Sequence, residues 1–272
     1  MGEKNSLCFR GNQLDTSHSR VVGALVFILC FCLTAQGVLA TSIVVVRTDS
    51  GIIIAADSKI THPGTTTAGS GVICKIHPAR NFVWVSEGHY REDGAGFNLP
   101  SLVKTVDVNG ALADRMKAFE AIAKAPPREE LLNIRRVNPQ YFQAMLKRTH
   151  SFELAFIRVD DVPHWVSVTY QLRLSSAGKV ISTPNLMECP GKGCPPGESV
   201  LEMGSQNAMN KWMGEFKNGA HSPTDAADMA RILINLEIAD EPDHDGPPVQ
   251  ILEITRTGLR WIAKPPCSAG EN

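Results

Sequence analysis

Hydrophobic residues along this chain fall into short runs of strand length and longer stretches with helical spacing. The short runs are rich in β-branched residues and predict strands. These strands are expected at residues 42–48, 51–57, 72–77, 82–87, 151–159, 164–174 and 180–183, with a closing hairpin of 249–255 and 259–263. Helices are expected within residues 99–125, with a break near 107–110, and at 128–149, 205–217 and 223–237. Strands and pairs of helices in this order predict an α+β protein.

The first apolar run differs from the others in its position and its neighbours. Residues 21–33 are apolar, Arg20 precedes them, and Val-Leu-Ala follows at 38–40. An apolar core after a basic residue, with a small residue before the cut, is typical of a secretory signal peptide. Cleavage after Ala40 is expected to make Thr41 the first residue of the mature chain. An uncleaved signal anchor is the alternative, although the run is short for a spanning helix.

The composition describes an ordinary globular protein behind this leader. We expect a signal peptide at residues 1–40 and one large domain at 41–272. Hydrophobic residues make up 43% of the chain, charged residues make up 20%, and the net charge is −1. The chain therefore lacks the basic excess of a nucleic-acid-binding protein and the acidic block of a disordered tail. No second apolar run is long enough to span a bilayer, so no membrane partner is expected after cleavage.

The cysteines predict one covalent link. In an exported protein, Cys189 and Cys194 with a Gly-containing spacer predict a disulfide-closed loop. A metal site is the alternative, but it needs further soft ligands and there is no second cysteine pair nearby to supply them. Cys74 lies in a strand pattern and is expected to be a small buried hydrophobe.

A threonine at a new N-terminus combines two reactive groups in one residue. Its hydroxyl can attack a carbonyl group while its own α-amine takes the proton. The unperturbed pKa of an α-amine is about 7.7–8.0, close to working pH. An ordinary strand threonine is the commoner case, but the expected cut directly before Thr41 favours the catalytic interpretation.

The segment that begins at Thr41 resembles the start of proteasome β-subunits and their bacterial peptidase relatives, which are N-terminal-nucleophile hydrolases. The family opens with a catalytic Thr, an apolar strand, a Gly-containing turn and a second strand ending in Ala-Asp. Here these are Thr41 and residues 43–46, 49–51 and 55–57. Further matches are Cys74-Lys75-Ile76, the strand that ends at Gly88, and Gly204-Ser205 before a helix. The match is strong to residue 88, thin from about 90 to 198, and moderate again from 202.

This resemblance implies a four-layer αββα sandwich and a role for each matched residue. Thr41 would be the nucleophile, and Lys75, held charged by Asp57, would lower the pKa of the Thr41 amine. The backbone N–H of Gly88 would stabilise the oxyanion, although a turn glycine is the alternative there. Taken alone, Asp57 and Lys75 would more often be surface charges. Both lie in strongly apolar strands, where an unpaired charge is costly, so a buried pair is expected.

The resemblance is weaker at the end of the site. Ser205 and an acid after the penultimate helix would support the amine; alignment points to Asp243, with Asp240 and Asp245 as close competitors. The family's Ser/Gly-rich segment is replaced here by EPDHDGPP at residues 241–248. That segment faintly resembles a calcium loop, but Leu252 stands at the acidic twelfth position and a strand follows. We therefore expect no metal and no cofactor.

The sequence predicts an exported threonine-type peptidase or amide hydrolase that acts on a peptide or amide substrate. The resemblance also allows a homo-oligomer. Ala40 stands in place of the family's Gly before the self-cut Thr, so export rather than self-cleavage is expected to expose Thr41. Two alternatives stay open. A non-peptide amidase or acylase would be decided by the pocket near Thr61, Gly71 and Gly88, and a non-catalytic binding module would more often have lost the matched residues.

Overall fold

A computed structural model describes residues 41–60, 69–88, 91–92, 97–106, 110–123, 126–148, 150–195, 199–204, 206–242 and 245–264. The chain divides into Met1–Gln36 and Gly37–Asn272, and all of these residues belong to the second part. The expected signal peptide therefore lies outside the described residues. Within the described ranges, no helix is long and apolar enough to cross a membrane.

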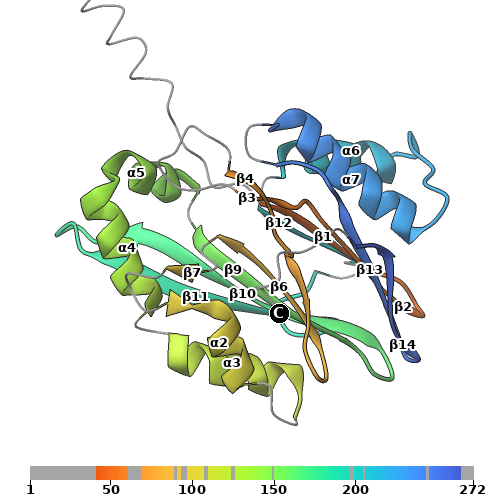
Figure 1. Ribbon diagram of the computed structural model, residues 1–272, viewed down its shortest axis with the longest axis horizontal. Coiled ribbons are helices and arrows are strands. Elements are labelled where there is room, and N and C mark those ends of the chain that lie inside the picture. The colour runs from red at the N-terminus through yellow and green to blue at the C-terminus, as the bar shows by residue number, and fades with distance from the viewer. Residues whose placement is uncertain are drawn as a thin grey trace, which may run out of the picture. The chain divides into compact units, whose positions relative to one another are not determined.

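Two five-stranded antiparallel sheets form the centre of the fold (Figure 1). The first sheet consists of β12 (Val200–Gly204), β1 (Ser42–Arg47), β2 (Gly51–Ala56), β13 (Gln250–Thr255) and β14 (Gly258–Ala263), in that order. The second consists of β11 (Val180–Cys189), β10 (Pro163–Leu174), β9 (His150–Val159), β6 (Val83–Gly88) and β5 (Ile76–Pro78). Two small hairpin sheets pair β3 (Lys59–Ile60) with β4 (Gly69–Val72) and β7 (Arg91–Glu92) with β8 (Phe97–Asn98).

The helices lie against these sheets in two groups. They are α2 (Leu99–Thr105), α3 (Leu112–Ala123), α4 (Pro126–Val137), α5 (Pro139–Arg148), α6 (Asn207–Lys217) and α7 (Ala226–Asp240). Helix α7 contacts β1 and β2, and α6 packs on α7, whereas α3, α4 and α5 contact the strands of the second sheet. Figure 1 shows the same division, with α6 and α7 beside the first sheet and α2 to α5 beside the second. The protein is therefore of the α+β class, as the sequence predicts.

The main hydrophobic core lies where the two sheets face each other. Alternate residues of the strands contribute to it, among them Ile43, Val45, Ile52, Ile54, Val83, Val85, Ala155, Ile157 and Trp165. The other face of β1 and β2 packs on α6 and α7 through a second cluster that includes Val44, Ile53 and Leu233. These two strands are buried on both faces, which explains why their sequences are continuous apolar runs rather than alternating ones.

Three predicted elements differ from the structure. The strand expected at residues 72–77 is interrupted, because β4 ends at Val72 and β5 begins only at Ile76. The helix expected at residues 128–149 is two helices, α4 and α5, which are separated at Asn138. Pro139 is the cause, because a proline disfavours the helical conformation of the residue before it. The strand expected at 180–183 extends to Cys189 as β11 and pairs with β10 over its whole length. Pro184 interrupts the apolar pattern there, but an edge strand tolerates a proline because one side needs no ladder bond.

The cysteines give one agreement and one correction. Cys189 and Cys194 are joined by a disulfide, with their Cα atoms 5.1 Å apart, as the spacing predicts. Cys74 is buried, with 7% of its surface exposed. It is also disulfide-bonded, so the expectation of a simple hydrophobic thiol is wrong. Neither Cys189 nor Cys194 is its partner, because these two pair with each other.

Candidate active site

Thr41 lies directly before β1, between the ends of neighbouring strands. Ser42 pairs with Gly204 at the end of β12. Gly204 has a φ of +87°, and a Cβ on it would lie 1.4 Å from the carbonyl oxygen of Thr41. Only glycine allows the start of β1 to approach β12 this closely. Thr41 itself is half-buried, and strand alternation from Ile43 places it on the side that faces the second sheet.

Asp57 and Lys75 form the buried ion pair that the sequence predicts. Asp57 directly follows β2, and Lys75 directly precedes β5. The Lys75 Nζ is 2.5 Å from the Asp57 Oδ1, and the two side chains are 4% and 0% exposed. Asp57 also accepts hydrogen bonds from the backbone N–H groups of Ser42, Lys59 and Gly246, at 3.0, 3.1 and 3.3 Å. A buried carboxylate with four donors is well compensated for its loss of water.

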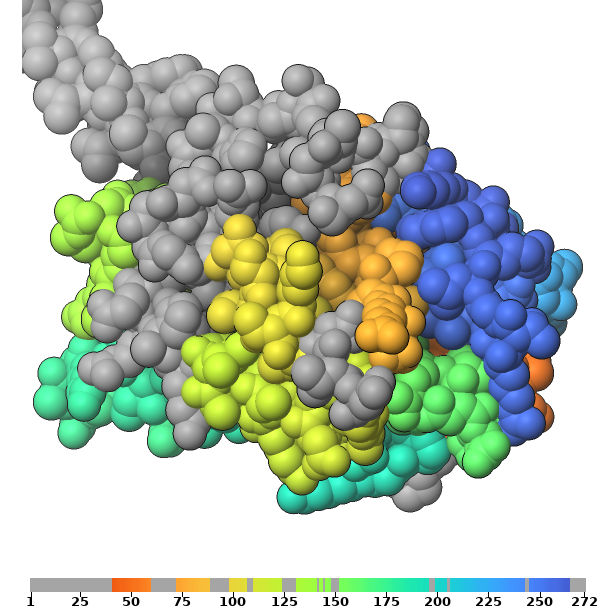
Figure 2. Space-filling view, turned by 60° about the horizontal axis from the view of Figure 1, so that its bottom comes forward, coloured from red at the N-terminus to blue at the C-terminus, as the bar shows by residue number. Residues whose placement is uncertain are grey.

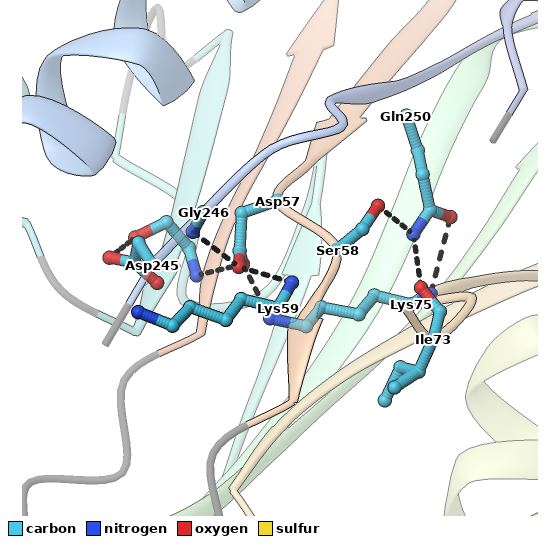
Figure 3. A network of polar contacts seen from close by, with 9 residues as sticks. Asp57, Ser58, Lys59, Ile73, Lys75, Asp245, Gly246 and Gln250 are labelled. Carbon is cyan, nitrogen blue, oxygen red and sulfur yellow. Dashed lines mark hydrogen bonds and ion pairs between the residues drawn. The ribbon is translucent and has the colours of Figure 1, made fainter. Parts of the chain in front are cut away.

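The contact with Ser42 links this ion pair to the expected nucleophile. The N–H that Asp57 accepts belongs to the peptide bond between Thr41 and Ser42. Figure 3 shows the side chains of Asp57 and Lys75 pointing toward one another, with Gly246 beside them. The structure therefore brings three of the predicted residues, Thr41, Asp57 and Lys75, into one site.

A buried glutamine holds the segment before Lys75 in place. Gln250, at the start of β13, is fully buried. Its Oε1 accepts the backbone N–H of Lys75 at 3.2 Å, and its Nε2 donates to the Ser58 Oγ at 2.9 Å and to the Ile73 carbonyl oxygen at 2.7 Å (Figure 3). Sequence reasoning missed Gln250, although a lone amide in the apolar strand QILEIT is a usable signal.

Of the three candidate acids near the end of α7, Asp245 lies in the site. It is 1% exposed, and its Oδ2 accepts the Ser42 hydroxyl at 2.7 Å. Burial, and then the nearby carboxylate of Asp57, raise the pKa of Asp245 to about 7. Asp240 is exposed at the end of α7. Asp243 and Ser205 lie outside the described residues, so their predicted roles stay predictions.

Lys59 is a second residue that the sequence did not single out. Its Nζ donates to the Pro242 carbonyl oxygen at 2.5 Å. Its side chain lies against Gly246, where an added Cβ would be 3.0 Å from the Lys59 Cδ. The backbone N–H of Ser58 also donates to the Gly246 carbonyl oxygen, at 3.0 Å. Lys59 and Ser58 thus fasten the segment that contains Asp245 to the end of β2.

Gly88 ends β6 with a φ of +93°, a conformation that favours glycine. Its predicted role as an oxyanion donor stays a prediction. Figure 2 shows part of the orange segment, residues 69–88, at the surface, between the yellow helix α2 and the blue C-terminal part of the chain. Among the described residues, no group of three or more His, Cys, Asp or Glu side chains could hold a metal ion.

Comparison with known proteins bears on the fold of this protein but not on its activity. No protein-family model matches the sequence, and no curated protein matches it. Among solved structures, the chain is similar to the Anbu (Gly-1) mutant from Hyphomicrobium sp. strain MC1. The TM-score is 0.51 at 13% identity, over 85% of this chain and 88% of that chain. The fold is proteasome-like. At this identity the likeness concerns the fold alone.

Proposed function

We propose that this protein is a threonine-type amide hydrolase, acting as a peptidase, with Thr41 as its N-terminal nucleophile. The observation that supports this most strongly is the buried Asp57–Lys75 pair, which is hydrogen-bonded to the peptide N–H that directly follows Thr41. Two ionised side chains are rarely buried without a purpose, and such groups cluster at functional sites. Here they lie beside the one residue that can supply both a hydroxyl and an α-amine.

The proposed chemistry uses the α-amine as the base. The Lys75 ammonium disfavours a second positive charge nearby and keeps the amine unprotonated. The Thr41 Oγ attacks the substrate carbonyl carbon while its proton moves to the α-amine. The backbone N–H of Gly88 stabilises the resulting oxyanion. When the C–N bond breaks, the amine returns the proton to the leaving nitrogen, and water then hydrolyses the ester on Thr41.

The proposal includes the route by which Thr41 is exposed. We propose that the protein is exported and that signal cleavage after Ala40 creates the active N-terminus. The Cys189–Cys194 disulfide agrees with an oxidising compartment. We also propose that the two sheets and their two groups of helices are the four layers of an αββα sandwich. We also propose that the protein can form a homo-oligomer. Size-exclusion chromatography with light scattering would test this.

The proposed function is tested on exported protein made from the full chain. The N-terminus is first determined by mass spectrometry and is expected to be Thr41. The protein is then assayed on a panel of fluorogenic peptide amides and on simple acyl amides, beside the Thr41→Ala and Thr41→Ser variants. We expect hydrolysis by the wild type, none by Thr41→Ala, and reduced hydrolysis by Thr41→Ser, which keeps a hydroxyl beside the amine.

Two results would contradict the proposal. A mature N-terminus at Gln36, produced by cleavage after Ala35 instead of Ala40, would leave the Thr41 hydroxyl without its own free amine. Full hydrolysis by a folded Thr41→Ala variant would show that another group is the nucleophile. If the protein hydrolyses only acyl amides, it is an amidase rather than a peptidase, and the proposed mechanism is unchanged.

A further inference from the structure

A second disulfide involves Cys74, which lies between β4 and β5 and directly precedes Lys75. Cys74 is 7% exposed and is disulfide-bonded. The chain has seven cysteines, and Cys189 and Cys194 pair with each other. The partner of Cys74 is therefore one of the remaining four, which are Cys8, Cys30, Cys32 and Cys267. The first three precede Ala40 and leave the chain with the proposed signal peptide, so Cys267 is the candidate in the mature protein.

The end of β14 lies near the segment that joins β4 to β5. Strands β13 and β14 are antiparallel, and Ala263 at the end of β14 pairs with Ile251 near the start of β13. The residue before Ile251 is Gln250, whose side chain binds this segment at two points. Its Nε2 donates to the Ile73 carbonyl oxygen at 2.7 Å, and its Oε1 accepts the Lys75 backbone N–H at 3.2 Å (Figure 3). The chain after β14 therefore leaves the first sheet close to this segment.

The distance that remains is short enough for Cys267. This residue lies outside the described residues, four positions after Ala263. Four residues of extended chain reach about 13–14 Å, and a disulfide joins Cα atoms about 4.4–6.8 Å apart. The gap to be covered is one strand spacing, about 4.7–4.9 Å, and the length of one hydrogen-bonded glutamine side chain. Cys267 can therefore reach Cys74 without any change in the described residues.

We propose that Cys74 and Cys267 form a disulfide in the mature protein, and that this link positions Lys75. The inference rests on the proposed function, in which cleavage after Ala40 removes the other three cysteines. The bond forms by thiol–disulfide exchange with a small-molecule or protein disulfide of the oxidising compartment. One cysteine thiolate attacks that disulfide, and the other displaces the oxidant from the mixed disulfide. The oxidant leaves as two thiols, with the two electrons and the two protons.

The link adds a covalent restraint beside a residue that is held by hydrogen bonds. Gln250 binds the backbone of Lys75, and Asp57 binds its Nζ. A bond at Cys74 restricts the backbone from which the Lys75 side chain extends. The effect of Lys75 on the pKa of the Thr41 amine depends on the distance between the two charges, so a looser backbone would weaken it.

Peptide mapping of exported protein made from the full chain tests the pairing. Free thiols are blocked with iodoacetamide, and the unreduced protein is digested with trypsin and analysed by mass spectrometry. Trypsin cuts after Lys59, Lys75 and Arg260, so Cys74 and Cys267 fall in different peptides. We expect these two peptides to be linked and to separate on reduction. Cys74 that is blocked by iodoacetamide, or linked to any other residue, would overturn the inference.

The same digest keeps this inference apart from the proposed function. An N-terminal peptide that begins before Thr41 contradicts the proposed cleavage, whereas the linked peptide still shows which cysteine binds Cys74. Protein that begins at Thr41 but hydrolyses no amide contradicts the proposed activity and leaves the pairing decided by the map.

The melting temperatures of three variants test the pairing a second way. Cys74→Ser, Cys267→Ser and the double variant all lose the same bond, so each should lower Tm by the same several degrees. Additive losses in the double variant would show that the two cysteines do not pair, and would overturn the inference.

The activity profile tests the positioning role. In Cys267→Ser, kcat should fall several-fold with little change in KM, and the acidic limb of kcat/KM should move to higher pH. The Lys75 ammonium lowers the pKa of the amine, so a less well placed Lys75 lets that pKa rise. The matched control is the double variant Cys189→Ser and Cys194→Ser, because Cys189 ends β11, at the opposite edge of the second sheet from β5. It should lower Tm without moving the limb. A limb that stays in place in Cys267→Ser, or moves equally in the control, overturns the positioning role.

Discussion

The same strands form two very different ends of the space between the sheets. At the end far from Thr41, β6 and β9 contribute Val83 and Ile157, and the fully buried Trp165 packs beside them. At the near end, the same two strands contribute Glu87 and Glu153. The far end removes apolar surface from water, which is the main source of stability. The near end gathers charges whose burial costs free energy, as expected where a fold has been shaped for chemistry.

Removal of Lys75 should have the largest effect, and it acts on the near end. Lys75→Ala deprives the amine of the charge that keeps it unprotonated, so kcat/KM should fall by about 10²–10⁴-fold, the range of base catalysis. Lys75→Arg should also fail, because a guanidinium has a different shape and donor geometry. Asp57→Asn should be milder, since Asp57 positions Lys75 without touching the substrate. Rates on a peptide amide, with the Thr41 terminus confirmed, measure all three.

The matched control is Lys117→Ala, which removes an exposed lysine on α3. Circular dichroism should show that Lys75→Ala is folded, although it leaves Asp57 buried without its cation. Full activity in that variant would exclude the proteasome-like mechanism and leave only the fold.

Truncation of Trp165 tests the far end. Trp165→Ala should lower the free energy of unfolding by about 3–5 kcal/mol, because it opens a cavity in the core between the sheets. The rate per folded molecule should stay close to that of the wild type. Urea denaturation measures the first quantity, and a rate normalised to folded protein measures the second. A large loss of activity with little change in stability would show that the two ends are not separate.

A methyl group on Gly204 tests the approach of β1 to β12. Gly204→Ala combines a positive φ with a Cβ 1.4 Å from the Thr41 carbonyl oxygen, so it should displace Thr41 and lower kcat at least tenfold. Gly219→Ala is the matched control, since Gly219 has a φ of +78° but open space around its Cβ position. It should show only the cost of backbone strain, about 1–3 kcal/mol, with normal kcat. Equal losses of kcat in both variants would contradict the crowding argument.

Measured per pH unit, the smallest expected effect is a pH dependence of stability at the near end. The pKa of Asp245 is raised from 3.8 to about 7 in the folded state. Its contribution to stability is therefore fully present below pH 3.8 and is lost as the pH rises through 7, with a slope of at most about 1.4 kcal/mol per pH unit. Asp245→Asn should remove that slope, and Asp240→Asn, at an exposed position, should not.

Urea titrations at several pH values measure this dependence, and the comparison must be made against the wild type at each pH. The pKa of His77 is lowered to about 4 by burial, so His77 gives a stability term of opposite slope between about pH 4 and 6.5. This term is common to both proteins and cancels in the difference. A difference that does not change between pH 4 and 8 would contradict the assignment.

Local patterns account for what the sequence could predict. The apolar runs next to Thr41, Asp57 and Lys75 can be recognised from the sequence alone. The positions of these three residues at strand ends could therefore be inferred. The partners of Lys59 and Gln250 could not be inferred, because they lie 183 and 192 residues away along the chain. The position of Glu87 opposite another acid could not be inferred, for a different reason. Its strand FVWVSEG fits the family pattern through Gly88, and only the register with β9 shows that it faces another acid.

The four donors to Asp57 have a consequence for the timing of activity. They come from the start of β1, the segment after β2, the segment before β5 and the segment before β13, and lie up to 189 residues from Asp57 along the chain. Contacts between segments this distant form late, because a long loop must close first. A chain emerging unfolded from a membrane channel would have its threonine at the front, but the Asp57–Lys75 ion pair would not yet be assembled beside it. If the proposed function and export hold, the protein would thus stay inactive during transit and become active only when its last segment has folded.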